Sequence, residues 1–116
     1  MISSEVQLLN SIAPGHETEL PDGFAAAHSK EACGNDDPTA FHDKQVYLDL
    51  FDKVRSVTLA VLDSYPESDL DNPAPETLRD FCPTMGDMFV LIATHPLMHA
   101  GQFVIVRRQL GKPVLM

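Results

Sequence analysis

Residues 84–113 read TMGDMFVLIATHPLMHAGQFVIVRRQLGKP, and this stretch predicts one long helix over residues 85–110. Thr84 followed three residues later by Asp87 is typical of a capping box at a helix start, and Gly111 with a proline two residues beyond it marks the end. Apolar side chains cover more than one face of this segment. A helix of that kind should be buried on most sides, so we expect other parts of the protein to cover it.

Two histidines, His95 and His99, stand four residues apart within this helix. Side chains at that spacing project from one face, so both imidazoles can reach a single metal ion. Gln102 follows on the same stripe, where it can hydrogen-bond a ligand or a metal-bound water. The alternative is a chance pair that only forms hydrogen bonds at a helix surface or in a core. Pro96 costs about 3 kcal/mol inside a helix unless the helix kinks, which predicts a kink beside the pair.

Weaker signals predict the other elements. Ser4 can cap a short helix that Pro14-Gly15 ends. Residues 14–40 are rich in Gly, Pro, Asp and Asn, and they predict a long irregular loop with one helical turn at residues 22–28. Apolar residues at three- and four-residue steps predict a second long helix over residues 43–64. The fold class is therefore all-α.

The apolar helix of residues 85–110 needs more cover than this chain supplies. One further long helix and one short helix can hardly bury it. Exposed contiguous apolar surface commonly marks an interface between subunits. We therefore predict a homodimer, in which a second copy covers the helix.

Composition narrows the class of protein. A chain of 116 residues fits a single domain, and 44% hydrophobic residues argue against general disorder. The net charge of −9 argues against nucleic acid as a partner, because such surfaces need clustered Lys and Arg. Cys33 and Cys82 lie far apart in a chain without a signal peptide or an 18-residue apolar run, which predicts a reduced, cytoplasmic protein with no membrane partner. Cys82 precedes the last helix, where either a lowered thiol pKa or simple apolar burial is expected.

The run His-x-x-x-His-x-Gly-Gln, followed by Arg-Arg-x-Leu-Gly-x-Pro, closely resembles the last helix of the DinB-like superfamily, metal-binding four-helix bundles of bacteria. The resemblance extends upstream to Pro83-Thr84, to residues 20–24 and to Asp36-Asp37-Pro38. It implies one domain over residues 1–116, a partial up-down bundle shortened at its N-terminal end. The family's first helix and first histidine ligand would precede residues 4–9, so both are expected to be missing, through an internal start or in a shortened paralogue.

The resemblance also implies a function. His95 and His99 would be metal ligands, and imidazole suits zinc, nickel, copper and iron, of which we expect zinc or nickel. A catalytic metal takes about three protein ligands. The candidates for the third, from this chain or a partner subunit, are His16, His28, His42, Asp43 and Asp87. The implied activity is that of a transferase acting with a low-molecular-weight thiol, with no catalytic residue assigned; the alternative is a non-catalytic helical dimer whose metal site is vestigial or absent.

Overall fold

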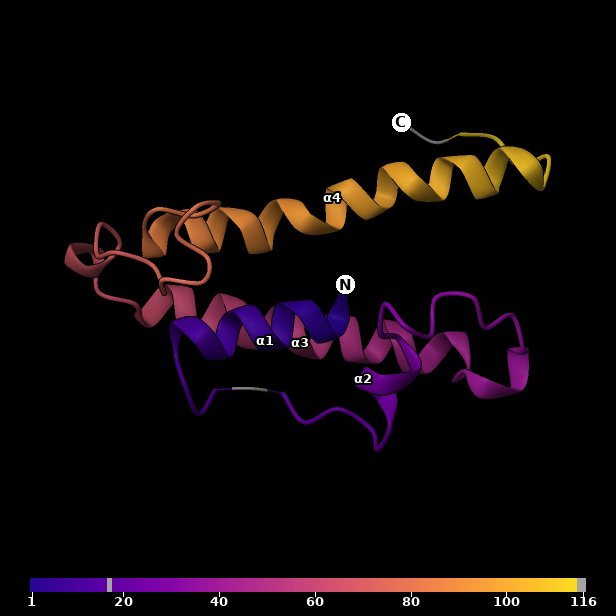
Figure 1. The fold of residues 1–116 in the computed structure, drawn as a ribbon, viewed down its shortest axis with the longest axis horizontal. Helices are drawn as coiled ribbons and strands as arrows, with labels where there is room; N and C mark the ends of the chain where they lie inside the picture. Colours follow the sequence, from indigo (N-terminus) through magenta and orange to yellow (C-terminus); the bar gives the residue numbers. More distant parts are fainter. Residues whose placement is uncertain (17, 115–116) are drawn as a thin grey trace.

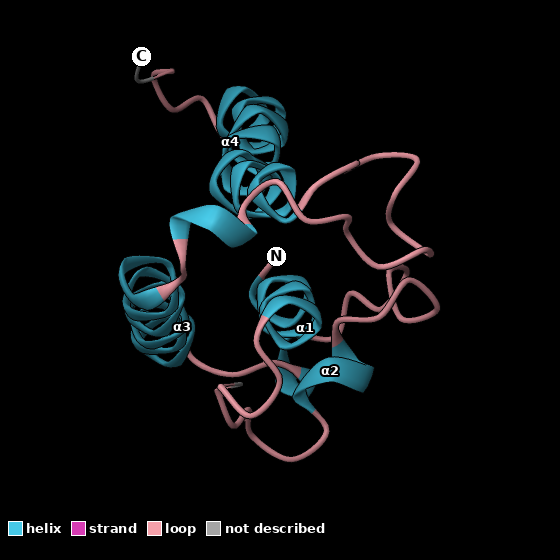
Figure 2. Cartoon of the chain, turned by 90° about the vertical axis from the view of Figure 1, so that its left-hand side faces the viewer, coloured by secondary structure: helices cyan, strands magenta, loops and turns pink. Residues whose placement is uncertain are grey.

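The computed structural model describes residues 1–16 and 18–114, and within them every regular element is helical. This confirms the all-α class. The α-helices are α1 (Ile2–Ile12), α2 (Phe24–Ala27), α3 (Lys44–Ser64) and α4 (Met85–Gln109), and two 3₁₀ turns occupy Pro38–Ala40 and Glu67–Asp69. Figure 1 shows α4 running above α1 and α3, which lie together below it. Seen from the end of the molecule, α1, α3 and α4 surround the core (Figure 2).

Helices α1 and α3 are joined by a buried ion pair. The Glu5 side chain is only 3% exposed, and its carboxylate accepts hydrogen bonds from Arg55 at 2.9 Å and from the Thr58 hydroxyl at 2.8 Å. A buried carboxylate is costly unless charge and hydrogen bonds compensate it, and both do so here. This pair fixes α1 against the middle of α3.

The first half of α4 packs on α1 and α3. Met88 and Ile92 face inward and join Leu9 of α1 and Val61 of α3 in one apolar cluster. Met88 has no exposed surface at all. One part of the core therefore lies under the first two turns of α4, and a second buried cluster joins Ile2 of α1, Phe24 of α2 and Leu50 and Val54 of α3.

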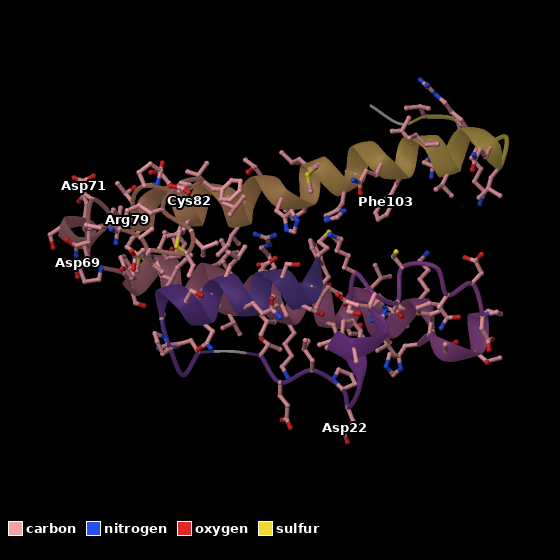
Figure 3. The ribbon with its side chains drawn as sticks, viewed as in Figure 1. Asp22, Asp69, Asp71, Arg79, Cys82 and Phe103 are labelled. Carbon is pink, nitrogen blue, oxygen red and sulfur yellow. The ribbon has the colours of Figure 1, made fainter. Side chains whose placement is uncertain are left out.

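The second half of α4 lies largely in solvent. Beyond Pro96, six large apolar side chains are more than half exposed: Leu97, Met98, Phe103, Ile105, Val106 and Leu110. Figure 3 shows the contrast between Cys82, at the packed end where α4 begins, and Phe103, far along the helix. As the composition predicts, the rest of the chain does not cover the whole apolar surface of α4. The second copy that we expect to cover the remainder stays a prediction.

Helix boundaries follow the local signals closely. Residues Thr84 and Asp87 form the predicted capping box, in which the Asp87 N–H donates to Thr84 Oγ1 and the Thr84 N–H donates to Asp87 Oδ2. Gly111 adopts a φ of +66°, the left-handed conformation that ends a helix at low cost in glycine. Helix α4 continues without interruption through Pro96, so the proline does not end it.

Two expectations for the N-terminal part need correction or refinement. Ser4 does not cap α1, because the helix begins at Ile2 and Met1 occupies the N-cap position without a side-chain hydrogen bond. Ile2 is buried, and this burial favours a start before Ser4. The helical turn expected at residues 22–28 is present as α2.

Helix α4 is also long and apolar enough to cross a membrane, by length and composition alone. The sequence has no strictly apolar run of that length, but an average over 18 residues reaches a mean hydropathy of 1.5. A core helix of a soluble protein passes the same test. The cytoplasmic location and the absence of a membrane partner therefore stay predictions.

Candidate metal centre

The candidate centre is the histidine pair in the middle of α4. His95 and His99 lie one turn apart, and their Nε2 atoms approach to 3.1 Å. The two rings meet edge to face with centroids 4.7 Å apart. Both side chains are partly exposed. The predicted juxtaposition of the two imidazoles is therefore present, next to Pro96.

Gln102 orients the second of these rings. Its Oε1 atom lies 2.8 Å from His99 Nδ1. An amide oxygen only accepts, so Nδ1 of His99 carries the proton and Nε2 keeps its lone pair. Nε2 of His95 then donates to that lone pair. When the His95 proton moves to Nδ1, the Nε2 lone pairs of both rings are available to a metal ion.

The surroundings of His95 favour its neutral form. Burial lowers the pKa of His95, and the neighbouring His99 and the positive charge at Met1 act in the same direction. The effect of Met1 means that the start of α1 lies near His95, and Figures 1 and 2 both show the N-terminal end just below α4. Because a metal binds the neutral imidazole, a lowered pKa reduces competition from protons near neutral pH.

The surroundings of the pair differ on its two sides. Toward the start of α4, Met88 and Ile92 are fully buried in the core. Toward the end of the helix, Gln102, Phe103 and Val106 are exposed. The site is therefore half enclosed and half open to solvent.

Among the described residues, the structure does not bring a third ligand to the pair: no three His, Cys, Asp or Glu side chains form a group suited to a metal ion. His16 is exposed in the segment after α1, and Asp43 precedes α3 as its N-cap residue. Asp87 is engaged in the capping box with Thr84. The remaining two candidates, His28 and His42, belong to an aromatic cluster around Phe24 of α2 and Tyr47 of α3, and not to the histidine pair.

The sequence does not predict this aromatic cluster of Phe24, His28, His42 and Tyr47. His28 stacks on Phe24 at 4.4 Å between ring centroids, and its two ring nitrogens contact the Phe24 carbonyl oxygen and the Tyr47 hydroxyl, each at 2.8 Å. His42 also stacks on Phe24, with the two ring centroids 5.9 Å apart. The only local signal is the helical turn at residues 22–28, which gives no hint that Tyr47 of α3 lies beside it.

Of the two outcomes expected for Cys82, a lowered thiol pKa or apolar burial, the structure shows apolar burial. The side chain is buried, at 3% exposure, and burial raises the pKa of its thiol, with a smaller contribution from the charge of Asp87. A thiol in such surroundings stays protonated and is a poor nucleophile. Cys82 therefore packs in the core as a small apolar residue.

Comparison of the chain with protein-family models, with curated proteins and with solved structures found no match.

Proposed function

We propose that this chain binds a divalent metal ion, zinc or nickel, through His95 and His99, as a shortened member of the DinB-like bundles. The 3.1 Å separation of the two Nε2 atoms supports this most directly. Two nitrogen ligands at about 2.0–2.1 Å from a tetrahedral ion lie about 3.3 Å apart. The two side chains therefore need almost no rearrangement to share an ion.

The hydrogen bond from His99 to Gln102 gives further support. Metal-bound histidines commonly donate their other ring N–H to an oxygen acceptor, which orients the ring and raises the basicity of the ligand nitrogen. Gln102 accepts such a bond at 2.8 Å. The donor set, two neutral imidazoles with one oriented from behind, fits zinc and nickel chemically.

The third protein ligand is proposed to come from a second copy of the chain. This copy would dock on the open side of the pair, where Gln102 and Phe103 are exposed.

The activity proposed for this site is the transfer chemistry of a low-molecular-weight thiol, as the resemblance implies. A bound divalent ion supplies positive charge that favours the thiolate, the nucleophilic form of a thiol. In this chain His95 and His99 would hold the ion, and Gln102 would keep the His99 ring in place. The pair is half-buried, and Gln102 and Phe103 beside it are exposed, so a substrate could reach the ion from solvent.

Metal content tests the proposed site. Protein purified without a histidine tag and equilibrated with zinc or nickel, then dialysed, is expected to retain one ion per chain or per dimer. His99→Ala removes one of the two ligands and the partner of Gln102, so we expect the retained metal to fall to background. Elemental analysis by mass spectrometry measures this directly.

The matched control is Thr94→Ala, which truncates another exposed side chain of α4 whose hydroxyl bonds only the Val90 and Leu91 carbonyl oxygens, and should leave the metal content unchanged. Equal loss in Thr94→Ala and His99→Ala would contradict the role of His99 as a ligand. Wild-type protein that retains no metal would contradict the proposal and favour the alternative function.

The alternative is a non-catalytic helical dimer, and the exposed second half of α4 favours it. In both versions we expect dimerisation, because six large apolar side chains lie in solvent beyond Pro96. Light scattering after size exclusion should give the mass of a dimer at micromolar concentration. Phe103→Asp places a charge among these side chains, so we expect at least a tenfold weaker dimer.

Phe81→Asp is the matched control for this variant, because Phe81 is 82% exposed but lies outside α4. It should leave the dimer intact. A wild-type protein that elutes as a monomer, or a Phe103→Asp variant that dimerises as tightly as the wild type, would show that α4 is not the interface.

A further inference from the structure

The outer side of α4 carries apolar side chains that stay exposed. At about 3.6 residues per turn, Leu97, Met98 and Ile105 project from one side of the helix, with Arg108 beside them. These three apolar side chains are 69%, 55% and 62% exposed. Figure 1 shows α4 along one edge of the molecule, with α1 and α3 on its inner side. We call Leu97, Met98, Ile105 and Arg108 the outer face of α4.

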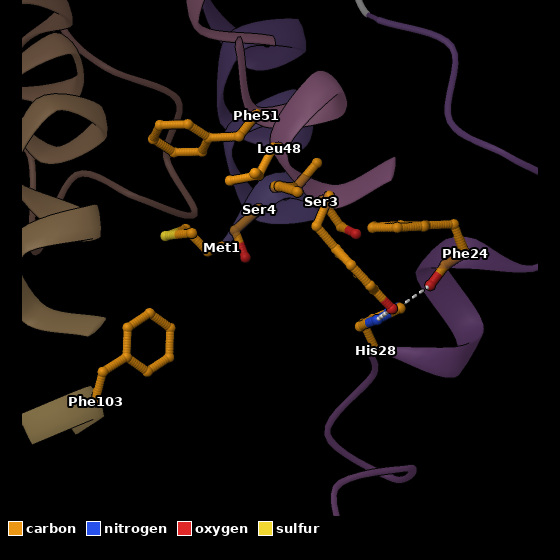
Figure 4. Close-up of a pocket in the computed structure, with 10 residues that line it drawn as sticks. Met1, Ser3, Ser4, Phe24, His28, Leu48, Phe51 and Phe103 are labelled. Atoms are coloured by element: carbon orange, nitrogen blue, oxygen red, sulfur yellow. Dashed lines mark hydrogen bonds between the residues drawn. The ribbon is translucent and has the colours of Figure 1, made fainter. Parts of the chain in front are cut away.

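The inner side of α4 faces the rest of the chain. Phe103 lies about 120° or more around the helix axis from each apolar residue of the outer face. Its ring lines a pocket of about 410 Å³ together with Phe24 of α2 and with Tyr47 and Phe51 of α3 (Figure 4). The histidine pair and the docking of a second copy proposed above also use this inner side. Neither the fold of the described residues nor the proposed dimer therefore covers the outer face.

The charge of this part of the chain is opposite to that of the rest. None of the 17 acidic residues follows Asp87, whereas Arg107, Arg108 and Lys112 do. Arg107 Nε donates to the Pro113 carbonyl oxygen at 2.9 Å, and this bond holds the segment that contains Lys112 against the end of α4. The second half of α4 is therefore an apolar and cationic region on a chain with a net charge of −9.

This combination is complementary to anionic lipid. Apolar side chains of a helix on a membrane enter the boundary of the acyl chains, and neighbouring Lys and Arg side chains extend to the phosphate groups. A core helix of comparable hydropathy would be mostly buried. In α4, an 18-residue window has a mean hydropathy of 1.5, but only 11% of that window is buried. Packing within the described chain therefore does not account for the apolar character of the helix.

We propose that the outer face of α4 binds the surface of an anionic phospholipid membrane. Leu97, Met98 and Ile105 enter the boundary of the acyl chains, and Arg108 and Lys112 lie among the phosphate groups. This inference uses neither histidine of the proposed metal centre, so it goes beyond the proposed function and does not depend on it.

The helix lies on the membrane and does not span it. Its first half is fixed to α1 and α3, and Met88 there has no exposed surface. The second half alone is about 20 Å long, shorter than the hydrocarbon core of about 30 Å. The sequence-based expectation of no membrane partner rested on the lack of a strictly apolar run, and the exposure of the outer face replaces it. A cytoplasmic location remains compatible, because the inner leaflet is anionic.

Sedimentation with vesicles tests the binding. The full chain is mixed with vesicles of equal parts phosphatidylcholine and phosphatidylglycerol, or with pure phosphatidylcholine, in the presence of a chelator that removes metal ions. We expect binding to the anionic vesicles that is at least about tenfold tighter than binding to the neutral ones. Each Lys or Arg near an anionic surface adds about fivefold in affinity, and the acidic remainder of the chain offsets part of this gain.

Two substitutions test the outer face. Ile105→Asp places a carboxylate at an exposed position, so we expect the helical circular dichroism signal to persist and binding to both kinds of vesicle to fall at least about tenfold. Arg108→Gln should weaken binding to anionic vesicles about fivefold and leave binding to neutral vesicles unchanged. The matched control is Leu59→Asp, which adds the same charge at a 52% exposed position of α3 and should bind as the wild type does.

An introduced tryptophan reports insertion directly, because the chain has none of its own. The emission of Leu97→Trp should shift to shorter wavelength when anionic vesicles are added, since the ring leaves water. Leu59→Trp, on α3, should show no shift under the same conditions.

A wild-type protein that stays in the supernatant with anionic vesicles would overturn the proposal. If Ile105→Asp dissociates the dimer in the same case, the outer face is an interface between copies. Equal binding to the two kinds of vesicle would overturn the role of the basic residues. Equal losses in Ile105→Asp and Leu59→Asp, or equal emission shifts in the two tryptophan variants, would rule out the outer face as the contact with lipid.

Discussion

The Met88→Ala variant is expected to lose about 2–5 kcal/mol of unfolding free energy, the range for deleting a fully buried large side chain. Met88 has no exposed surface and packs in the cluster that joins α4 to α1 and α3. Alanine leaves a cavity there, and the lost contacts are the main attachment of α4. Urea denaturation followed by circular dichroism measures the change.

Val90→Ala is a control that truncates an apolar side chain of the same half of α4. Val90 is 60% exposed, so its truncation should change the unfolding free energy by no more than about 0.5 kcal/mol. Equal losses in the two variants would contradict the packing described for the first half of α4, because they would require both side chains to be buried to the same degree.

Replacing Arg55 by methionine is expected to cost about 3 kcal/mol, the lower end of the range for breaking a buried ion pair. The reason is the carboxylate that stays behind. Glu5 is 3% exposed, and without Arg55 its carboxylate keeps one hydrogen-bond donor among the described residues, the Thr58 hydroxyl, and the charge of the Met1 ammonium. The lower end applies because the Arg55 side chain is 24% exposed, so water partly screens the pair.

A second substitution identifies the cause. In the double variant Glu5→Gln, Arg55→Met no charge is buried, and the amide oxygen can still accept from Thr58. We expect it to recover most of the stability that Arg55→Met loses. Lys53→Met, at an exposed position of α3, should have little effect. A double variant no more stable than Arg55→Met would show that arginine stabilises the protein through packing and not through charge.

Local signals predict the helices of this chain well. Thr84, Asp87 and Gly111 define the ends of α4 because capping boxes and left-handed glycines act within one helical turn. The same holds for the pair His95 and His99, whose spacing alone brings their Nε2 atoms together. The misplaced cap at Ser4 has a tertiary cause, since the buried Ile2 favours an earlier start of α1.

Contacts between distant segments could not be predicted. Glu5 meets Arg55 and Thr58 across about half the chain, and nothing in the local pattern of either helix indicates this. The His28–Tyr47 hydrogen bond depends on how residues 18–43 turn back to α3. The pocket lined by Phe24 of α2, Tyr47 of α3 and Phe103 of α4 depends on the same segment, so only the assembled structure reveals it.

The position of Pro96 bears on how α4 unfolds. Proline has no N–H, so the Ile92 carbonyl, one turn earlier, lacks its usual helical partner exactly where the packed half of α4 gives way to the exposed half. We therefore expect the exposed half to unfold locally more easily than in a helix without a proline at this position. His95 lies on the packed side of this joint and His99 on the exposed side. An ion bound by both histidines, as proposed, would link the two halves of α4. Part of its binding energy would then stabilise the exposed half against local unfolding.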